Sequence, residues 1–345
     1  MEKKEIIWRE DKPNSDESNI PLLLWRGDEN NSATLSLAFG KFDKEIVKLS
    51  TEENIAIQVD TGNGDRVTET VAVDLTLPKD EKLSRKVYGL AGSGSDYLCT
   101  YCDESRATIK EPPYSGAKPV TLTSNLLNEA ARYGNINPAR VSQAVLVKQT
   151  LGVKEMPLTS TDPEREIPDT LHLDINVVQH LVCIACRIYH YGFAENPVFR
   201  YEKTELEKKD IEKSEEKYYS KLREKITTLP ELTQFPGNFA REYCLEDNAE
   251  FILEPLPECP EKQTFKSLMS LWRMMRTIHK SKADPTAEQI DLFSSWAHEF
   301  QERIYSLQWV NPANQVHRLS HLAYFMQSRE LKSIGAFSME GNYNY

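Results

Sequence analysis

The sequence lacks an excess of positive charge. Lys and Arg number 42 against 53 Asp and Glu, so the formal net charge of the 345-residue chain is −11. Because phosphate binding draws on clustered basic side chains, this balance excludes a protein whose whole surface binds nucleic acid. Any contact with nucleic acid must therefore be confined to a local basic region.

Long apolar runs and cysteines are also scarce. No apolar run approaches the roughly 18 residues of a membrane span, and the charged first residues lead into no secretory signal. Six cysteines without such a signal are typical of reduced thiols or metal ligands rather than of a disulfide framework. We therefore expect a soluble intracellular protein that contacts no membrane and has about two lobes.

The first part of the chain has a strand-like pattern. Runs at residues 5–9 and 20–25 predict strands, and the second run ends at Asp28 beside a glycine. A carboxylate at the end of a buried strand is a common catalytic acid, and it is equally common as a plain turn residue. Alternating residues on both sides of a Gly-Asn-Gly turn predict a hairpin over residues 56–60 and 70–75. Its acids, Asp60 and Asp74, are expected to be solvated.

From residue 83 onward the pattern becomes helical. It predicts two helices within residues 122–149, a buried helix at 171–191, an exposed ion-paired helix at 202–225 and an amphipathic helix at 285–307. The buried helix contains His180, Cys183 and Cys186, which would suit a metal site. We favour core packing for them, because free cysteine is among the most buried residue types.

Two pairs of metal-binding residues stand far apart in the sequence. His317 and His321 are four residues apart, so on a helix both imidazoles project from one face. Cys99 and Cys102 form a C-x-x-C pair, and two thiolates with two imidazoles make a tetrahedral zinc site. One ion would then tie the end of the chain to its first third. The alternative is two unrelated pairs, one of buried thiols and one of surface histidines.

The most informative positive charge lies between Lys262 and Lys282, an interval without an acidic residue. Basic side chains recur there at helical spacing, namely at Lys262, Lys266, Arg273, Arg276 and Lys280. Another face of the same helix is apolar, with Phe265, Leu268, Trp272 and Met275. The basic stripe is a candidate phosphate-binding surface, and a solvated helix face is the alternative.

The order of these motifs resembles the catalytic core of the V(D)J recombination-activating proteins and of the related Transib-type transposases. The matching pieces are collinear: residues 12–15 (KPNS), the strand that ends at Asp28, residues 87–103 with the C-x-x-C pair, residues 171–175 (LHLDI), residues 237–241 (GNFAR) and residues 333–342.

The resemblance implies an α+β, helix-rich fold. Residues 1–82 would form a partial RNase H-like sheet, residues 83–330 a large, mostly helical zinc-binding insertion, and residues 331–345 a return segment. Asp28 and Glu340 would be catalytic acids that hold Mg²⁺ or Mn²⁺, with Arg241 near the DNA. The zinc ligands would be Cys99, Cys102, His317 and His321, although the histidines of the family pattern are five residues apart.

The function that the resemblance implies is DNA recombination or transposition in the nucleus. The substrate would be double-stranded DNA with terminal repeats or recombination signals, and the protein would act as a homodimer with a second recombinase subunit. The chemistry needs a further aspartate, which we expect upstream of residue 5, so we expect this chain to be an incomplete core, inactive alone. The alternatives are a non-catalytic, zinc-stabilised module that binds DNA or protein, and an unrelated metalloenzyme that uses Asp60, Asp74 or Cys183.

Overall fold

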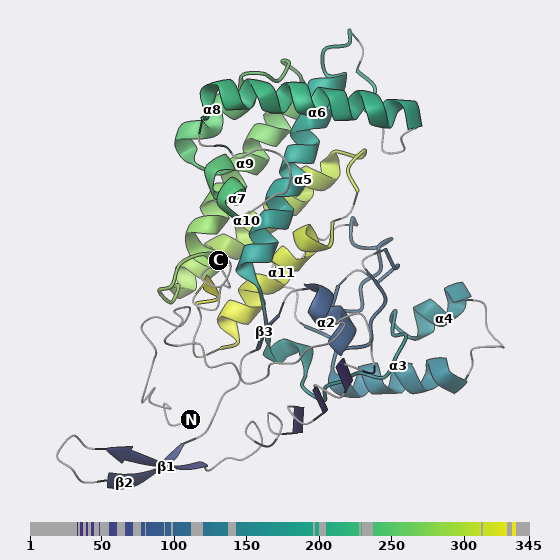
Figure 1. Cartoon of the computed structure of the whole chain (residues 1–345), viewed down its shortest axis with the longest axis vertical. Helices are drawn as coiled ribbons and strands as arrows, with labels where there is room; N and C mark the ends of the chain where they lie inside the picture. Colours follow the sequence, from purple (N-terminus) through teal and green to yellow (C-terminus); the bar gives the residue numbers. More distant parts are fainter. Residues whose placement is uncertain are drawn as a thin grey trace. The chain divides into compact units, whose positions relative to one another are not determined.

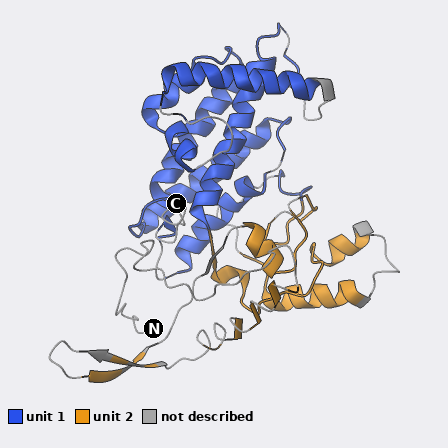
Figure 2. Ribbon diagram, viewed as in Figure 1, with its two compact units in different colours: residues 1–19, 106–119, 169–345 blue, residues 20–105, 120–168 orange. Residues whose placement is uncertain are grey.

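The computed structural model describes part of the chain and divides it into two compact units (Figure 2). The described residues are single positions between 33 and 48 and the ranges 55–60, 66–71, 77–79, 81–92, 94–97, 99–111, 120–136, 143–195, 197–199, 205–227, 229, 237–311, 313–329 and 333–335. The strands predicted at residues 5–9 and 20–25 lie outside them, as do Asp28, Asp74 and Glu340. We call residues 1–19, 106–119 and 169–345 the helical unit, and residues 20–105 and 120–168 the mixed unit.

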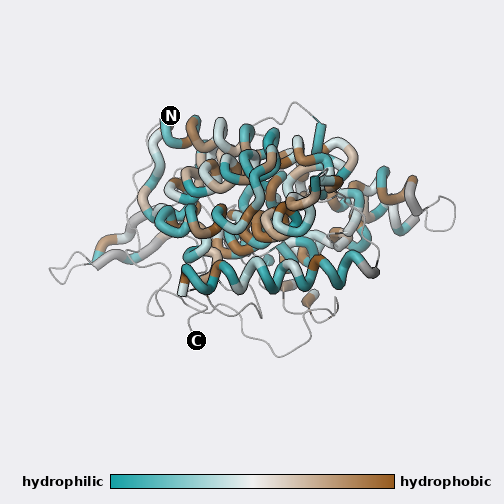
Figure 3. Tube along the Cα trace, turned by 90° about the horizontal axis from the view of Figure 1, so that it is seen from above, coloured by the Kyte–Doolittle hydropathy of each residue, from teal (hydrophilic) through white to brown (hydrophobic). Residues whose placement is uncertain are grey.

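The helical unit is built around one long helix, α5 (Thr170–Tyr191), which packs against α6, α7, α9 and α11 (Figure 1). The remaining elements are α6 (Glu205–Lys225), α7 (Gly237–Tyr243), η2 (Glu246–Asn248), α8 (Ala249–Leu253), α9 (Pro260–His279), α10 (Ala287–Ser306) and α11 (Asn314–Gln327). Hydrophobic and hydrophilic stretches alternate along these helices, as the spacing of apolar residues in the sequence predicts (Figure 3). α10 packs against both α9 and α11.

Side chains at the helix starts explain where α5 and α10 begin. Asp169 precedes α5, and its carboxylate accepts hydrogen bonds from the backbone N–H groups of Leu171 and His172. Thr286 precedes α10, and it exchanges side-chain and backbone hydrogen bonds with Gln289. Such caps satisfy N–H groups that have no partner within the helix, which stabilises a helix by about 1 kcal/mol each.

α5 corrects one expectation from the sequence. By length and composition it is apolar enough to cross a membrane, whereas the sequence showed no run of that length. In the structure it is a core helix, with Val178, Leu181 and Ala185 fully buried and 61% of its most apolar stretch buried. The prediction of a buried helix over residues 171–191 is confirmed.

The N-terminal part of α5 carries a buried ion pair. Asp174 is 1% exposed, and its two carboxylate oxygens accept hydrogen bonds from Arg276 Nε at 2.7 Å and Arg276 Nη2 at 2.8 Å. Lys280 Nζ lies 3.7 Å from the same carboxylate. A buried carboxylate is tolerated when it is paired in this way, so α5 and the C-terminal end of α9 are fixed to each other.

Within its described residues, the mixed unit contains two small sheets, three helices with defined bounds and single helical positions between residues 33 and 48. β1 (Ile55–Asp60) and β2 (Arg66–Val71) form an antiparallel hairpin, and β3 (Leu77–Lys79) pairs in parallel with β4 (Glu166–Pro168). The helices are α2 (Glu81–Val87), α3 (Ser124–Ile136) and α4 (Gln143–Gln149), and the short η1 (Pro163–Arg165) precedes β4. The predicted hairpin is confirmed, with its second strand starting four residues earlier than the sequence pattern indicated.

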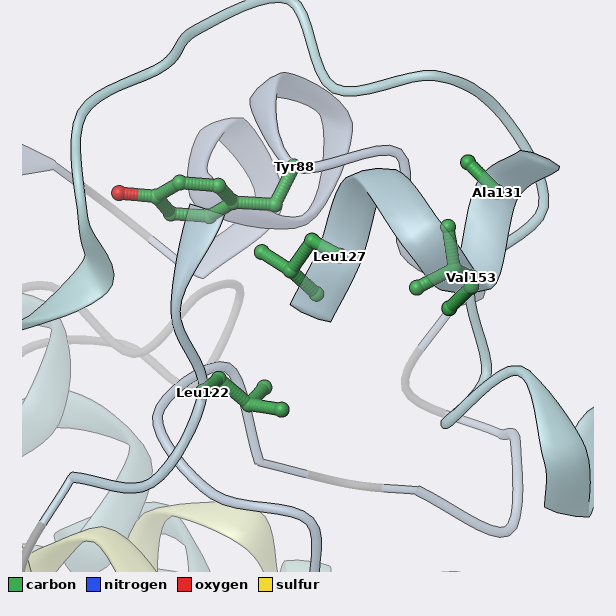
Figure 4. Packing of buried hydrophobic residues seen from close by; sticks show 6 residues of the cluster. Tyr88, Leu122, Leu127, Ala131 and Val153 are labelled. Carbon is green, nitrogen blue, oxygen red and sulfur yellow. The ribbon is translucent and has the colours of Figure 1, made fainter. Parts of the chain in front are cut away.

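The core of the mixed unit lies around Tyr88 and Val153 (Figure 4). Leu122, Leu127 and Ala131 pack into the same cluster. Beside it, Gly89 adopts a positive φ of 67°, and a Cβ atom there would lie 2.1 Å from the Glu155 carbonyl oxygen. Only glycine permits this approach, so Gly89 determines how the loop at residues 152–158 packs on α2.

The helical predictions are confirmed with two corrections. Two helices separated by a break lie within residues 122–149, and amphipathic α10 lies within residues 285–307. α6 was expected to be an exposed helix, but Ile211, Tyr218 and Leu222 are buried on its inner face. Cys183 was expected in the core, but it is exposed, and of the two α5 cysteines Cys186 is the buried one.

His279 is a buried histidine on α9 that packs among aromatic rings. Its ring lies 5.1 Å from the Trp272 ring and 6.2 Å from that of Phe293, and its Nδ1 lies 3.0 Å from the Met275 carbonyl oxygen. Burial lowers the pKa of His279 to about 3, and the neighbouring charges of Lys280 and Arg276 act in the same direction. The folded protein therefore contains this ring in its neutral form.

Acid should destabilise the helical unit through His279. The unfolded chain takes up a proton below about pH 6.5, which folded His279 cannot do until about pH 3, so stability falls as the pH drops through this interval. We expect that His279→Phe removes about 2 kcal/mol of the stability loss between about pH 7 and about pH 5. Urea unfolding of both proteins at the two pH values measures this difference. Equal losses in the two proteins would contradict it.

Candidate metal centre

The C-x-x-C pair lies on a tight turn in the mixed unit. Cys99 and Cys102 are both buried, and the Tyr101 carbonyl oxygen accepts hydrogen bonds from the N–H groups of Thr121 and Leu122. The Tyr101 N–H group donates to Cys99 Sγ at 3.3 Å. A backbone N–H group that points at sulfur favours a thiolate, which is the form of cysteine that binds metal ions.

The histidine pair lies on α11 in the helical unit, where 12 of the 14 helix residues are buried. The rings of His317 and His321 are 5.1 Å apart at their centroids, and their planes are nearly perpendicular. Gln301 on α10 donates to the Val316 carbonyl oxygen at 2.8 Å and so fixes the start of α11. The predicted placement of both imidazoles on one helix face is confirmed.

The four side chains offer one ligand atom each, and these atoms all lie within 4.8 Å of one another. The two Nε2 atoms of the histidine pair are 3.3 Å apart. In a tetrahedral site with Zn–N distances of about 2.0–2.1 Å, two nitrogens are separated by about 3.3 Å. The histidine pair therefore already has the spacing that two ligands of one zinc ion require.

The chemistry of the four ligands also fits zinc. Two thiolates neutralise the charge of Zn²⁺, and two neutral imidazoles complete the four-coordinate shell of a structural site. A neutral assembly can be buried at far lower cost than a bare ion, which agrees with the burial of all four residues. An N–H···N hydrogen bond would also account for the 3.3 Å contact of the histidines. It would not account for the position of the two cysteine sulfurs beside them.

Among the described residues, these four form the one group of three or more potential metal ligands. The second C-x-x-C pair on α5 does not belong to such a group: Cys183 is exposed and Cys186 is buried. In the described part of the chain, the Cys99 pair and not the Cys183 pair belongs to the group that could hold a metal ion.

The basic residues predicted on α9 have contacts inside the protein. Arg276 and Lys280 pair with Asp174, Arg273 Nε donates to the Cys244 carbonyl oxygen at 2.9 Å, and Lys262 Nζ donates to the Leu256 carbonyl oxygen at 2.9 Å. Lys266 is exposed. A role in DNA binding stays a prediction for all five, and the structure gives four of them an additional structural role.

Arg241 lies on α7 with its side chain 64% exposed, 3.7 Å from Glu242. Glu242 shares that charge, so the local field is less positive than a second basic residue would make it. Sequence reasoning assigned no structural role to Asp174, which links α5 to the C-terminal end of α9. The available signal was an isolated acid within a long apolar helix, which must be paired if that helix is buried.

Comparison with known proteins gives two family profiles in sequence order. Residues 1–95 match "Recombination-activation protein 1 (RAG1) RNase H domain", and residues 165–319 match "Recombination-activation protein 1 (RAG1) ZnH2 domain". The chain is 25% identical to V(D)J recombination-activating protein 1 of Oryctolagus cuniculus over 343 residues, which are 97% of this chain and 31% of the relative. The chain belongs to the family of V(D)J recombination-activating protein 1.

Other relatives in this V(D)J recombination-activating protein 1 family have a similar sequence identity to this chain. The protein of Xenopus laevis is 26% identical over 347 residues, and that of Oncorhynchus mykiss is 25% identical over 347 residues. Each alignment covers 97% of this chain, which spans about a third of the length of the relatives. With the ZnH2 profile, the four buried ligands support a structural zinc site in this family member.

Removal of the zinc ion should destabilise the protein. We expect one zinc per chain, and we expect Cys102→Ala and His321→Ala to abolish zinc binding and to lower Tm by about 10 °C, because structural zinc contributes several kcal/mol to folding. Elemental analysis and thermal unfolding with and without a chelator measure both effects. The control is Cys183→Ala, which should retain zinc. Full zinc content in the first two variants would contradict the assignment.

Proposed function

We propose that this chain is the core of a DNA recombinase of the DDE type, which cleaves and rejoins phosphodiester bonds in the nucleus. The observation that supports this most is the order of the two profiles, RNase H and then ZnH2, from one family of recombination-activating proteins. The names of the relatives describe V(D)J recombination. By that similarity the substrate is double-stranded DNA with recombination signals or terminal repeats.

The proposed architecture is a partial RNase H-like sheet that carries a helical insertion. Residues 1–82 supply the sheet, residues 83–330 supply the zinc-binding insertion, and residues 331–345 return to the catalytic site. The largely helical composition of residues 170–327 agrees with such an insertion. We further propose that the protein acts as a homodimer together with a second recombinase subunit, as the family resemblance implies.

Zinc has a structural role in this proposal. One ion bound by Cys99, Cys102, His317 and His321 ties the first third of the chain to the C-terminal helices. These ligands leave no open coordination position for water or substrate, which is typical of a structural and not of a catalytic zinc ion.

The catalytic acids in this proposal are Asp28 and Glu340, which would hold Mg²⁺ or Mn²⁺. Two such ions activate the attacking oxygen and stabilise the leaving oxygen of an in-line displacement at phosphorus. Carboxylate oxygens are the ligands that these hard cations prefer. Hydrolytic nicking and strand transfer are then the same displacement with water or a 3′-hydroxyl as the attacking group.

We propose that some of the basic residues bind DNA and that others stabilise the fold. Lys266 and Arg241 are exposed and can reach phosphates, whereas Arg276 and Lys280 use their charge to neutralise buried Asp174. Burial of the paired charges fixes α9, and the exposed residues of α7 and α9 then approach DNA from a rigid support. A local basic surface of this kind is compatible with a net charge of −11.

Cleavage should depend on both acids. In the longest protein that the gene encodes, we expect Mg²⁺- or Mn²⁺-dependent nicking of DNA with recombination signals or terminal repeats, and we expect Asp28→Asn and Glu340→Gln each to lower it at least about 100-fold, because each variant loses a metal-binding carboxylate. Gel assays of nicking and strand transfer measure this, with unchanged DNA binding as the control. Nicking that survives both substitutions would reject the proposal. DNA binding without cleavage by the unsubstituted protein would favour a non-catalytic module.

DNA affinity should respond to the exposed basic residues. We expect Lys266→Ala and Arg241→Ala each to reduce the salt dependence of DNA binding by about one phosphate contact. The control is Lys217→Ala, which removes an exposed lysine of α6. Arg276→Met should instead lower folding stability by about 3–5 kcal/mol, because buried Asp174 would lose both hydrogen bonds from Arg276. An unchanged salt slope in the Lys266 and Arg241 variants would exclude these two residues from the DNA-binding surface.

A further inference from the structure

Residues 333–335 are hydrogen-bonded to the loop that follows α9. The Ser333 N–H group donates to Asp284 Oδ1 at 2.8 Å, and its hydroxyl group donates to the Ser281 carbonyl oxygen at 2.7 Å. Ile334 is 1% exposed, so the segment is buried as well as hydrogen-bonded. A bond to a charged acceptor such as Asp284 is among the stronger hydrogen bonds in proteins.

Gly335 allows the segment to approach α9 more closely than other residues would. A Cβ atom at this position would lie 2.4 Å from the Ser281 carbonyl oxygen and 2.8 Å from that of Lys280. Both neighbours are backbone atoms, which cannot rotate away as the end of a flexible side chain can. Glycine is therefore required for this contact.

The surface that receives the segment is itself held in place. Lys280 follows the last residue of α9, and its side chain lies 3.7 Å from the Asp174 carboxylate on α5. The Ser281 hydroxyl accepts a hydrogen bond from the Ala283 N–H group at 3.1 Å, which shapes the loop that leads to Asp284. The contacts of residues 333–335 are thus made to a backbone that the buried ion pair fixes.

We propose that Asp284 and Gly335 are positioning residues for Glu340. Together with Ser281 and Ser333 they form what we call the return clamp, which fixes residues 333–335 against the loop that follows α9. Glu340 follows Gly335 by five residues. Fixing Gly335 therefore limits the region that the Glu340 carboxylate can reach. The role at Glu340 rests on the proposed function, whereas the clamp itself rests on the contacts described above.

The clamp is tested by amide hydrogen exchange on the zinc-loaded full chain. We expect Asp284→Ala to raise the exchange rate of peptides that contain residues 333–340 at least about tenfold, because the Ser333 N–H group loses a charged acceptor. Asp284→Asn still offers an oxygen and should behave like the unsubstituted protein. The control is Asp291→Ala, which removes an exposed acid of α10.

Two further variants decide the outcome if Asp284→Ala does not fold. Ser333→Ala removes the bond to the Ser281 carbonyl oxygen, and Gly335→Ala introduces the clash; both should also speed exchange in the same peptides. Exchange as slow as in the unsubstituted protein in every folded variant would overturn the clamp.

A kinetic measurement tests the positioning role separately. In the longest protein that the gene encodes, Asp284→Ala should lower kcat for nicking about tenfold and raise the Mg²⁺ concentration needed for half-maximal rate. DNA affinity and zinc content should not change, and Asp284→Asn should restore both kinetic values. Faster exchange with unchanged kcat and metal requirement would overturn the positioning role. Absence of nicking in the unsubstituted protein would instead overturn the proposed function, and hydrogen exchange would still decide the clamp.

Discussion

Four buried side chains that share one small volume are the constraint on which the rest of the structure depends. Two thiols and two imidazoles, more than 200 residues apart in the sequence, place their ligand atoms within 4.8 Å of one another. Hydrophobic packing alone does not bring sulfur and nitrogen ligands together in this way, because it is not directional. A metal ion has the required directionality, and its binding free energy adds directly to that of folding.

The second constraint is electrostatic and lies within the helical unit. Asp174 is buried in the most apolar helix of the described chain. Its carboxylate pairs with Arg276 and Lys280, so these two basic side chains at the end of α9 face the protein interior and not the solvent. This explains how an acidic protein can contain a basic helix without presenting all of its charge to solvent. It also fixes the C-terminal end of α9, to which Ser333 and Gly335 attach.

Much of the helical unit could be predicted, because helical periodicity is local and α5, α9 and α10 follow it. The metal ligands could be predicted because a C-x-x-C pair and histidines four residues apart each have a spacing with chemical meaning. The partners of Arg276 and Lys280 could not, because Asp174 lies about 100 residues earlier and spacing along α9 does not reveal it. The exposure of Cys183 was missed for a different reason. Composition shows that α5 is mostly buried, but it does not show which side of the helix is exposed to solvent.

The most direct test of the shared metal site is X-ray absorption spectroscopy at the zinc edge of the purified chain. A site made by Cys99, Cys102, His317 and His321 predicts two sulfur ligands at about 2.3 Å and two nitrogen ligands at about 2.0 Å. The double variant His317→Ala/His321→Ala should bind no zinc and should therefore give no zinc-edge signal. A shell of four sulfurs, or one of nitrogen and oxygen without sulfur, would contradict the account.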